Sequence, residues 1–216
     1  MHNSPHLKEV VKEGEIPGGL QYLAEVTTKD EYKCTEHTHE WNWEKVVNMA
    51  KMKNFIIDYA LKADYDYLFF VDADLVLHPK TLVTLLETQK DIVSEIYWTR
   101  FSPDDIEAPN AWDFNQYDFK EGNMEKWRTP GLYPCGMSGA CILIHRKVFE
   151  VGANYSPIHN IAWWGEDRWF GARSAVHGFQ QWIDTHIPPI HLYRESELNK
   201  YVENGGYEAA FSYAKP

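Results

Sequence analysis

The chain has 216 residues, which is enough for one domain with a full hydrophobic core. Its 44% hydrophobic and 25% charged residues are typical of a folded globular protein and argue against disorder. The formal net charge of −11 repels nucleic-acid phosphates and anionic lipid surfaces, so we expect neither as the main partner. Aromatic residues make up 15% of the chain, and such side chains either fill a core or stack on sugars and bases.

The N-terminal segment and the cysteines indicate the cellular setting. Residues 1–15 contain no apolar stretch of the kind found in a signal peptide. No window approaches the roughly 20 apolar residues that a membrane span needs. The three cysteines show no CxxC spacing, which argues against a disulfide framework or a structural zinc site. A cytoplasmic location is therefore the expectation.

The first half of the chain alternates between strand and helix patterns. Apolar residues at spacings of three and four predict a helix over residues 43–61. A continuous apolar run over residues 67–71 predicts a central parallel strand covered on both faces. The remaining elements predicted here are a weak strand at 20–27, a short helix at 81–86 that follows Pro79, and a strand at 91–97. This alternation favours an α/β fold with an open, mostly parallel sheet flanked by helices.

Residues 98–134 have no periodicity and are rich in Pro, Asp, Asn and Trp, which is typical of a long functional loop. Regular patterns then return. They predict a strand at 140–144, a short helix from 146 to Gly152, a helix at 166–177 that Gly178 ends, and a strand at 179–183. No linker interrupts the chain, so we expect a single domain over residues 1–216.

Two aspartates, Asp72 and Asp74, directly follow the predicted strand at 67–71. On an extended chain their side chains project the same way, at the end of a strand where open α/β sheets bind ligands. A divalent cation that bridges to phosphate oxygens would remove the repulsion between them and could neutralise a diphosphate leaving group. The alternative is a pair of solvated loop aspartates that cap the next helix, and so short a motif leaves both open.

A second acidic pair, Glu166 and Asp167, opens the predicted helix at 166–177 and follows Trp163 and Trp164. A carboxylate beside an aromatic wall is a good environment for a base that deprotonates a sugar hydroxyl. The helix dipole alone also explains acids in a first helical turn. Pairing with Arg168 would likewise make the cluster structural.

The sequence from residue 53 onward resembles the GT-A glycosyltransferases, most closely the family 2-like nucleotide-sugar transferases. The stretches that carry the resemblance read KNFIID at 53–58 and YDYLFFVDADLVLHP at 65–79. The resemblance implies that Asp72 lies near the ribose or donor sugar and that Asp74 binds the metal. It also implies that Lys53 lies near the donor, the alternative being an exposed helix lysine.

Further positions follow from the same resemblance. The stretch WWGED at 163–167 looks like the helix start of inverting enzymes, which implies Asp167 as the base and Glu166 as the residue that orients the acceptor. Gly139 lies in a stretch that is similar to the family's acceptor-side segment, in which small residues let the backbone approach the donor sugar. A glycine-rich turn that enters a strand explains the glycine equally well.

Histidines and one arginine complete the candidate site. His191, after the last strand, matches a position where GT-A enzymes often place a metal ligand, and an imidazole with carboxylates and diphosphate would suit Mn²⁺. His186 is a weaker candidate, and His37 and His39 are expected to lie in a polar loop without a ligand role. Arg194 could donate two hydrogen bonds to phosphate.

The resemblance covers about residues 45–194 and fails before them. GT-A domains begin with two strands that build the nucleoside pocket, whereas the sequence before residue 43 has one plausible strand. We therefore expect either a domain that is truncated at its N-terminus or a fragment of a longer protein. Its unprotected sheet edge would favour pairing with a second copy, so a homodimer is the corresponding expectation.

The leading hypothesis is a glycosyltransferase that moves a sugar from a UDP- or GDP-sugar to a glycan or other hydroxyl acceptor. Inversion is expected from the resemblance at Asp167, with retention as the alternative. Mn²⁺ or Mg²⁺ would be held by Asp74, Asp72 and His191. The side chains expected to stack on the acceptor are Trp98, Trp112, Trp127, Trp163 and Trp164. The alternatives are a metal-dependent nucleotidyltransferase, for which no glycine- and arginine-rich phosphate loop is visible, and a non-catalytic carbohydrate-binding domain.

Overall fold

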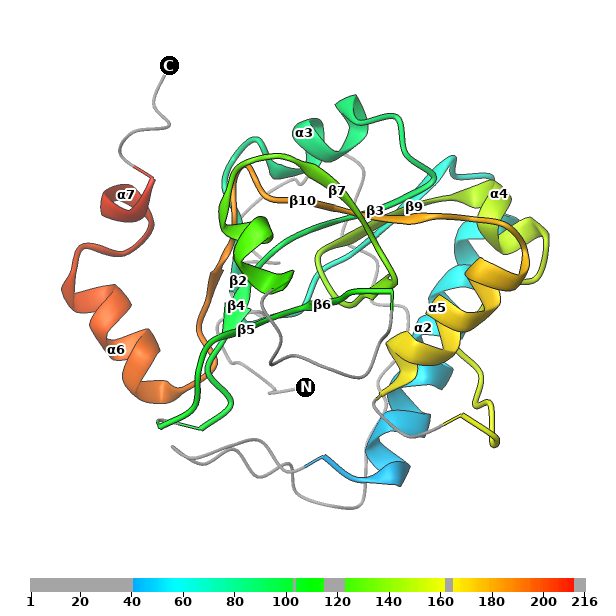
Figure 1. The fold of residues 1–216 in the computed structure, drawn as a ribbon, viewed down its shortest axis with the longest axis horizontal. Coiled ribbons are helices and arrows are strands. Elements are labelled where there is room, and N and C mark those ends of the chain that lie inside the picture. The colour runs from blue at the N-terminus through cyan, green and yellow to red at the C-terminus, as the bar shows by residue number, and fades with distance from the viewer. Residues whose placement is uncertain (1–40, 103, 115–122, 162–164, 212–216) are drawn as a thin grey trace.

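The computed structural model describes residues 41–102, 104–114, 123–161 and 165–211 (Figure 1). The predicted strand at 20–27, His37, His39, Trp163 and Trp164 lie outside the described residues. None of the helices in the described part is both long and apolar enough to cross a lipid bilayer.

A five-stranded sheet forms the centre of the molecule. Its strands, in spatial order, are β1 (Tyr67–Phe70), β9 (Ile142–His145), β3 (Ile92–Glu95), β10 (Gln181–Asp184) and β7 (Leu132–Cys135). β3 and β10 pair in parallel, and the other three pairings are antiparallel. Strands β1, β3 and β10 therefore point in the same direction, and their C-terminal ends meet along one edge, here called the carboxyl edge.

The α/β class is confirmed, but the expectation of a mostly parallel sheet with residues 67–71 at its centre is wrong for the described strands. β1 ends the described strand order, Tyr67 is exposed and the rest of β1 is only half-buried. The reason is β9, which runs in the opposite direction between β1 and β3. β1 and β3 are parallel to each other, as the β-α-β pattern indicates, yet an apolar run does not reveal which strand lies beside it.

Both faces of the sheet are covered by helices. On one face, α2 (Trp43–Lys62), α4 (Arg146–Glu150) and α5 (Glu166–Val176) pack together, and Figure 1 shows α2 beside α5. α3 (Thr81–Glu87) packs on the other face through Leu85, which is fully buried against Val93 and Leu143. The alternation of Ile142, Leu143 and Ile144 between the two faces explains why β9 is apolar throughout.

The helix predicted at 43–61 is confirmed as α2. The side chain of Asn42 accepts a hydrogen bond from the Lys45 backbone N–H at 2.9 Å and so caps its first turn. Its buried residues recur at helical spacing and comprise Val46, Ala50, Lys53, Ile57 and Ala60. A lysine in this apolar stripe is unusual and needs a partner inside the protein.

Short strands organise the region that was expected to be a loop. β4 (Trp98–Thr99) pairs with β5 (Ala108–Pro109), and β6 (Ala111–Trp112) pairs with β8 (Met137–Ser138). The 3-10 helix η1 (Asn123–Arg128) and β7 also lie in this region. The loop prediction for 98–134 is therefore wrong in part, because two-residue strands are too short to produce a periodic pattern.

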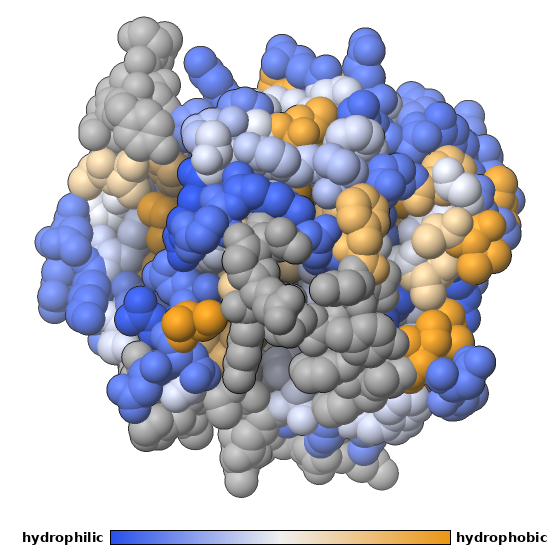
Figure 2. Space-filling view, in the orientation of Figure 1, coloured by the Kyte–Doolittle hydropathy of each residue, from blue (hydrophilic) through white to orange (hydrophobic). Residues whose placement is uncertain are grey.

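Two further elements close the described chain. β2 (Leu75–Val76) pairs with β11 (Ile190–His191), which joins the segment after β1 to the segment after β10. Helices α6 (Glu195–Glu203) and α7 (Gly206–Ala210) follow and lie on the opposite side of the molecule from α2 and α5 (Figure 1). The face drawn in Figure 2 is mostly hydrophilic, with apolar residues in small separate patches, as is usual for a folded domain.

Candidate functional site

Asp72 and Asp74 lie at the carboxyl edge, in the turn between β1 and β2. The Leu75 backbone N–H donates to the Asp72 carbonyl at 3.2 Å, and the Leu192 N–H donates to the Asp74 carbonyl at 2.9 Å. The pairing of β2 with β11 sets His191 opposite Leu75. Backbone hydrogen bonds thus bring two predicted candidates, Asp74 and His191, to the same place.

The side chains of Asp74 and His191 are in contact. His191 Nε2 lies 3.3 Å from Asp74 Oδ2, and the imidazole side chain is only 8% exposed. On the other side of the ring, His191 Nδ1 lies 2.8 Å from Thr99 Oγ1, and the ring of Tyr97 packs edge-on at 4.8 Å. Hydrogen bonding to Thr99 through Nδ1 leaves Nε2 facing Asp74.

The second oxygen of Asp74 is unsatisfied. Asp74 Oδ1 is buried and has no hydrogen-bond partner within the described part of the chain. A buried carboxylate oxygen without a donor is costly unless a water molecule or a cation contacts it. Carboxylate and imidazole groups are suitable ligands for Mn²⁺ or Mg²⁺. No three His, Cys, Asp or Glu side chains gather as a complete cation site among the described residues, so any cation here would need further ligands.

Lys53, Glu166 and Asp167 form a buried ion-pair cluster. Lys53 Nζ donates to Glu166 Oε1 at 2.7 Å and to Asp167 Oδ1 at 2.9 Å. Lys53 is 6% exposed, so the alternative of an exposed helix lysine is wrong. The acids open α5 after Gly165, whose φ of +104° favours glycine. The structure thus pairs both acids with a lysine from α2 that lies more than a hundred residues away in sequence.

Burial and charge shift the pKa values in this cluster. Burial raises the pKa of Asp167 to about 7, with Lys53 opposing the shift and Glu166 adding to it. Burial acts to lower the pKa of Lys53, but Asp167 and Glu166 raise it well above the usual value, so the lysine stays charged. The cluster therefore holds a permanent cation beside a carboxyl group that can exchange a proton near neutral pH.

Asp72 connects the two clusters electrostatically. Its pKa is raised because the surrounding chain reduces contact with water, and Asp74 and Glu166 add to this rise while Lys53 and His191 oppose it. Asp72 nevertheless retains exposed surface at the carboxyl edge. Direct contacts and charge interactions thus connect six predicted residues of one candidate site: Lys53, Asp72, Asp74, Glu166, Asp167 and His191.

Tyr97 and Tyr155 belong to this neighbourhood and were not predicted. Burial raises the pKa of Tyr97 well above its usual value, and Asp72, Asp167 and Asp74 contribute. Lys53 Nζ lies 4.8 Å from the centre of the Tyr155 ring, and the Tyr155 hydroxyl is buried without a hydrogen-bond partner among the described residues. Nothing in the sequence marks either tyrosine, because Tyr97 stands between Ile96 and Trp98 at the end of a predicted strand and Tyr155 lies in a polar segment without a motif.

Gly139 lies directly against the predicted base. A methyl group on Gly139 would collide with the carboxylate of Asp167. Asn110 holds this turn, since its Nδ2 donates to the Gly139 carbonyl at 2.7 Å and the Gly139 N–H donates to the Asn110 carbonyl at 2.9 Å. The next two residues, Ala140 and Cys141, have φ values of +43° and +41°, a strained conformation for residues with a side chain. Such strain is characteristic of functional sites.

Arg194 is engaged elsewhere. Its Nη2 donates to the carbonyls of Arg100 at 2.6 Å and Phe101 at 3.0 Å, and its Nη1 donates to Glu197 at 3.2 Å. These bonds attach the start of α6 to the segment after β4. The phosphate role proposed for Arg194 is a prediction that would require these bonds to be exchanged.

The tryptophans and His186 also differ from one another in environment. Trp127 is 2% exposed and packs in a core cluster, and Trp98 lies 3.8 Å from the Arg128 guanidinium. Trp112 is half-buried. His186 Nδ1 lies 3.0 Å from Asp184 Oδ2, away from Asp74. Stacking of an acceptor on Trp127 would require the side chain to leave the core.

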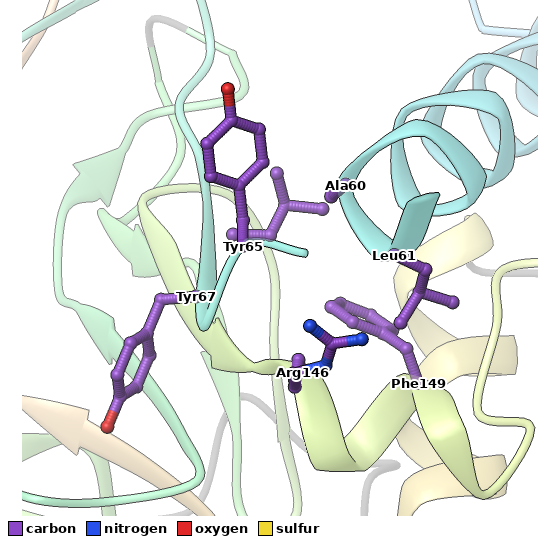
Figure 3. Close-up of a pocket in the computed structure, with 7 residues that line it drawn as sticks. Ala60, Leu61, Tyr65, Tyr67, Arg146 and Phe149 are labelled. Carbon is purple, nitrogen blue, oxygen red and sulfur yellow. The ribbon is translucent and has the colours of Figure 1, made fainter. Parts of the chain in front are cut away.

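A separate hollow lies near the N-terminal end of β1, the opposite end of that strand from Asp72 (Figure 3). Leu61, Tyr65, Tyr67 and Phe149 line it, and its volume of about 160 Å³ includes open solvent. The Arg146 guanidinium at its wall pairs with Glu150 at 2.7 Å and with Asp64. None of the site acids lines this hollow, so it forms no part of the candidate site.

The fold and site define an α/β protein with two acid clusters at the carboxyl edge of a mixed sheet. The family model of Anp1, a family of mannosyltransferase-like glycosyltransferases, matches residues 24–129, just under half of the chain. The matched stretch contains Lys53, Asp72 and Asp74 and ends before the α5 acids and His191. A comparison with curated proteins gives no match. Over the stretch that carries the aspartates, the chain is therefore similar to a family associated with glycosyltransferase activity.

Proposed function

We propose that the chain is a metal-dependent glycosyltransferase that uses a nucleotide-diphosphate sugar as donor. The observation that carries the proposal is the pairing of Asp74 with His191 beside a buried carboxylate oxygen that lacks a partner among the described residues. The similarity to Anp1 over residues 24–129 supports the transferase class.

The residues present fit a divalent cation. Asp74 would contribute its unsatisfied oxygen, His191 its Nε2, and Asp72 a second carboxylate. Because these groups do not form a complete ligand set, donor oxygens and water would supply the rest, which is common for Mg²⁺ and Mn²⁺ at phosphate sites. When bound, the cation supplies a Lewis acid that stabilises charge on the diphosphate.

Asp167 is the base in this proposal. It accepts the proton of the acceptor hydroxyl while the acceptor oxygen forms a bond to the anomeric carbon of the sugar. The bond between that carbon and the diphosphate oxygen breaks, and its electron pair leaves with the nucleoside diphosphate. Attack from the opposite face inverts the anomeric configuration. The pKa of Asp167, raised to about 7 by burial, is in the range that suits a base at neutral pH.

The remaining residues of the site hold Asp167 in place. Lys53 donates to Asp167 and Glu166, and Gly139 leaves room for the Asp167 carboxylate. Glu166 shares the lysine, and in this proposal it orients the acceptor hydroxyl. The lysine thus supports the base, and its interaction with Asp72 would place its charge near a bound donor.

The test is a panel of UDP- and GDP-sugars incubated with the wild-type chain, with Mn²⁺, with Mg²⁺ and without metal. We expect metal-dependent release of nucleoside diphosphate, lost in Asp74→Ala and retained in the control Asp58→Asn, which changes an exposed α2 aspartate. Wild-type turnover by Asp74→Ala would exclude the assigned metal site. The absence of any donor consumption by the wild type would contradict the transferase proposal itself.

A further inference from the structure

Two acids outside the proposed catalytic site, Glu95 and Asp184, are buried side by side. Glu95 is 0% exposed and Asp184 is 2% exposed. They end the parallel strands β3 and β10 and are direct partners in the strand register. Partners in adjacent parallel strands place their side chains on the same face of the sheet, so the two carboxyl groups are neighbours.

The hydrogen bonds of this pair leave one oxygen without a donor. Glu95 Oε1 accepts from the Ile187 backbone N–H at 3.1 Å, whereas Oε2 is buried and has no hydrogen-bond partner within the described residues. Asp184 Oδ1 accepts from the His186 backbone N–H at 3.0 Å, and Asp184 Oδ2 lies 3.0 Å from His186 Nδ1. The side chain that neighbours the Glu95 carboxyl in the strand register is another acid, Asp184.

We propose that Glu95 and Asp184 share one proton in the folded protein, and that this acid pair positions the segment 185–191, which carries His191. The role assigned to His191 rests on the proposed function, whereas the shared proton does not depend on it.

The electrostatic argument is direct. Two ionised carboxylates in a dry environment repel each other, and a single proton between them converts the repulsion into a hydrogen bond. The titratable groups that face Glu95 are Asp184, His186 and Cys141. No lysine or arginine in the described part of the chain forms an ion pair with either acid. Burial and Asp184 together raise the pKa of Glu95 to about 9, against the opposing Ile187 N–H.

The same pair ties the following segment to the sheet. The backbone N–H groups of His186 and Ile187 donate to Asp184 and Glu95, respectively. Thr185 adds a backbone bond to the Gly131 carbonyl at 3.0 Å. From this anchor the chain enters β11, where His191 meets Asp74 and Thr99. Removal of the carboxyl acceptors would release the start of the segment that carries the imidazole.

The pH dependence of stability tests the shared proton. The pKa of Glu95 in the folded protein is above its ordinary value of 4.5, so its stabilising contribution is complete below about pH 4.5 and is lost as the pH rises to about 9. In Glu95→Gln, the amide donates to Asp184 and accepts from Ile187 at every pH. We expect the thermal midpoint of wild type to fall relative to Glu95→Gln between about pH 5 and pH 9. Parallel curves would overturn the proposal.

Two controls make this result specific. Glu87→Gln changes an exposed glutamate on α3 and should follow the wild-type curve. If Glu95→Gln does not fold, Asp184→Asn serves instead, because it removes the Asp184 charge that adds to the rise in the pKa of Glu95 and should narrow the pH range over which stability falls, while burial still raises that pKa. Carboxyl ¹³C NMR gives a direct reading, with the Glu95 signal assigned by its absence in Glu95→Gln. A protonated signal at neutral pH supports the proposal, and an ionised signal overturns it.

The positioning role is read from the imidazole signals of His191 without metal or donor. We expect these signals to move in Glu95→Ala, which removes the anchor, and to return to wild-type positions in Glu95→Gln. Unchanged His191 signals in Glu95→Ala would exclude the positioning role. A chain without sugar-transfer activity would fail the tests of the proposed function yet give the same results here, so the two failures are distinguishable.

Discussion

The two acid clusters of the candidate site are compensated in different ways. Glu166 and Asp167 share one buried lysine, which offsets part of their combined charge. Asp74 contacts an imidazole and keeps one buried oxygen without a partner among the described residues. A compensated carboxylate suits proton transfer, whereas an uncompensated one suits a cation. In the proposed function, the cluster paired with the lysine exchanges a proton, and the cluster of Asp74 and His191 takes a cation.

The largest effect should come from Lys53→Met, which removes the compensation of the first cluster. Breaking a buried ion pair on one side leaves uncompensated charge and typically destabilises by about 3–5 kcal/mol. The pKa of Asp167 is raised from its ordinary value of 3.8 to about 7 in the folded wild-type protein. The contribution of Asp167 to the free energy of unfolding therefore already decreases as the pH rises between these two values. Lys53 lowers the pKa of Asp167, so removal of the lysine should raise this pKa further. The decrease in the free energy of unfolding should then continue to higher pH.

Urea unfolding of Lys53→Met between about pH 5 and pH 8 measures this effect. Lys51→Met, on an exposed position of α2, is the matched control. A stability loss equal to that of the control would show that the pairing contributes little.

Asp167→Asn should have a smaller effect on stability than Lys53→Met. It keeps an acceptor for Lys53 but removes the base. We expect the turnover number to fall by about 10²–10⁴-fold with little change in the unfolding midpoint. Steady-state kinetics at saturating donor and acceptor, with Asp58→Asn as the control, measures it. Turnover within a few-fold of wild type would remove Asp167 from the role of base and direct attention to Glu166.

Thr99→Val tests how the imidazole of His191 is held beside Asp74. The Thr99 hydroxyl contacts His191 Nδ1 at 2.8 Å, and valine keeps the shape while losing this hydrogen bond. Loss of such an outer partner of a metal ligand typically reduces metal affinity by about 10–100-fold. A titration of Mn²⁺ followed by thermal shift checks this. An unchanged midpoint of the titration would mean that Thr99 does not orient the ring.

Long periodic elements and local motifs were predictable from the sequence. The helix at 43–61 and both acid pairs could be predicted because helical spacing and the position of acids after a strand are local features. The direction of β9 could not, because it depends on the return path of the chain. Likewise, the pairing of Lys53 with Glu166 could not be predicted, because 113 residues separate the two in the sequence.

The missed residues share a common reason. Glu95 and Asp184 are each the last residue of a strand. An acid at the end of an apolar run is a sequence signal for a buried carboxyl group that needs a partner. Asn110 and Thr99 belong to a region of two-residue strands, where pairing with distant segments defines the structure. Their roles depend on tertiary contacts that no periodicity records.

The smallest effect on the metal-free protein should come from Asp74→Asn. Asparagine removes a negative charge that raises the pKa of Asp72. It also removes the charge from a carboxylate that has one unsatisfied oxygen. The free energy of unfolding without metal should therefore change by about 1 kcal/mol or less. With Mn²⁺ at about 100 times its dissociation constant, wild type should gain about 2.7 kcal/mol, because the cation binds only the folded state. The variant should gain far less. Thermal unfolding with Mn²⁺ and with a chelator separates the two cases, and equal stabilisation of both proteins would show that the unsatisfied oxygen of Asp74 is no cation ligand.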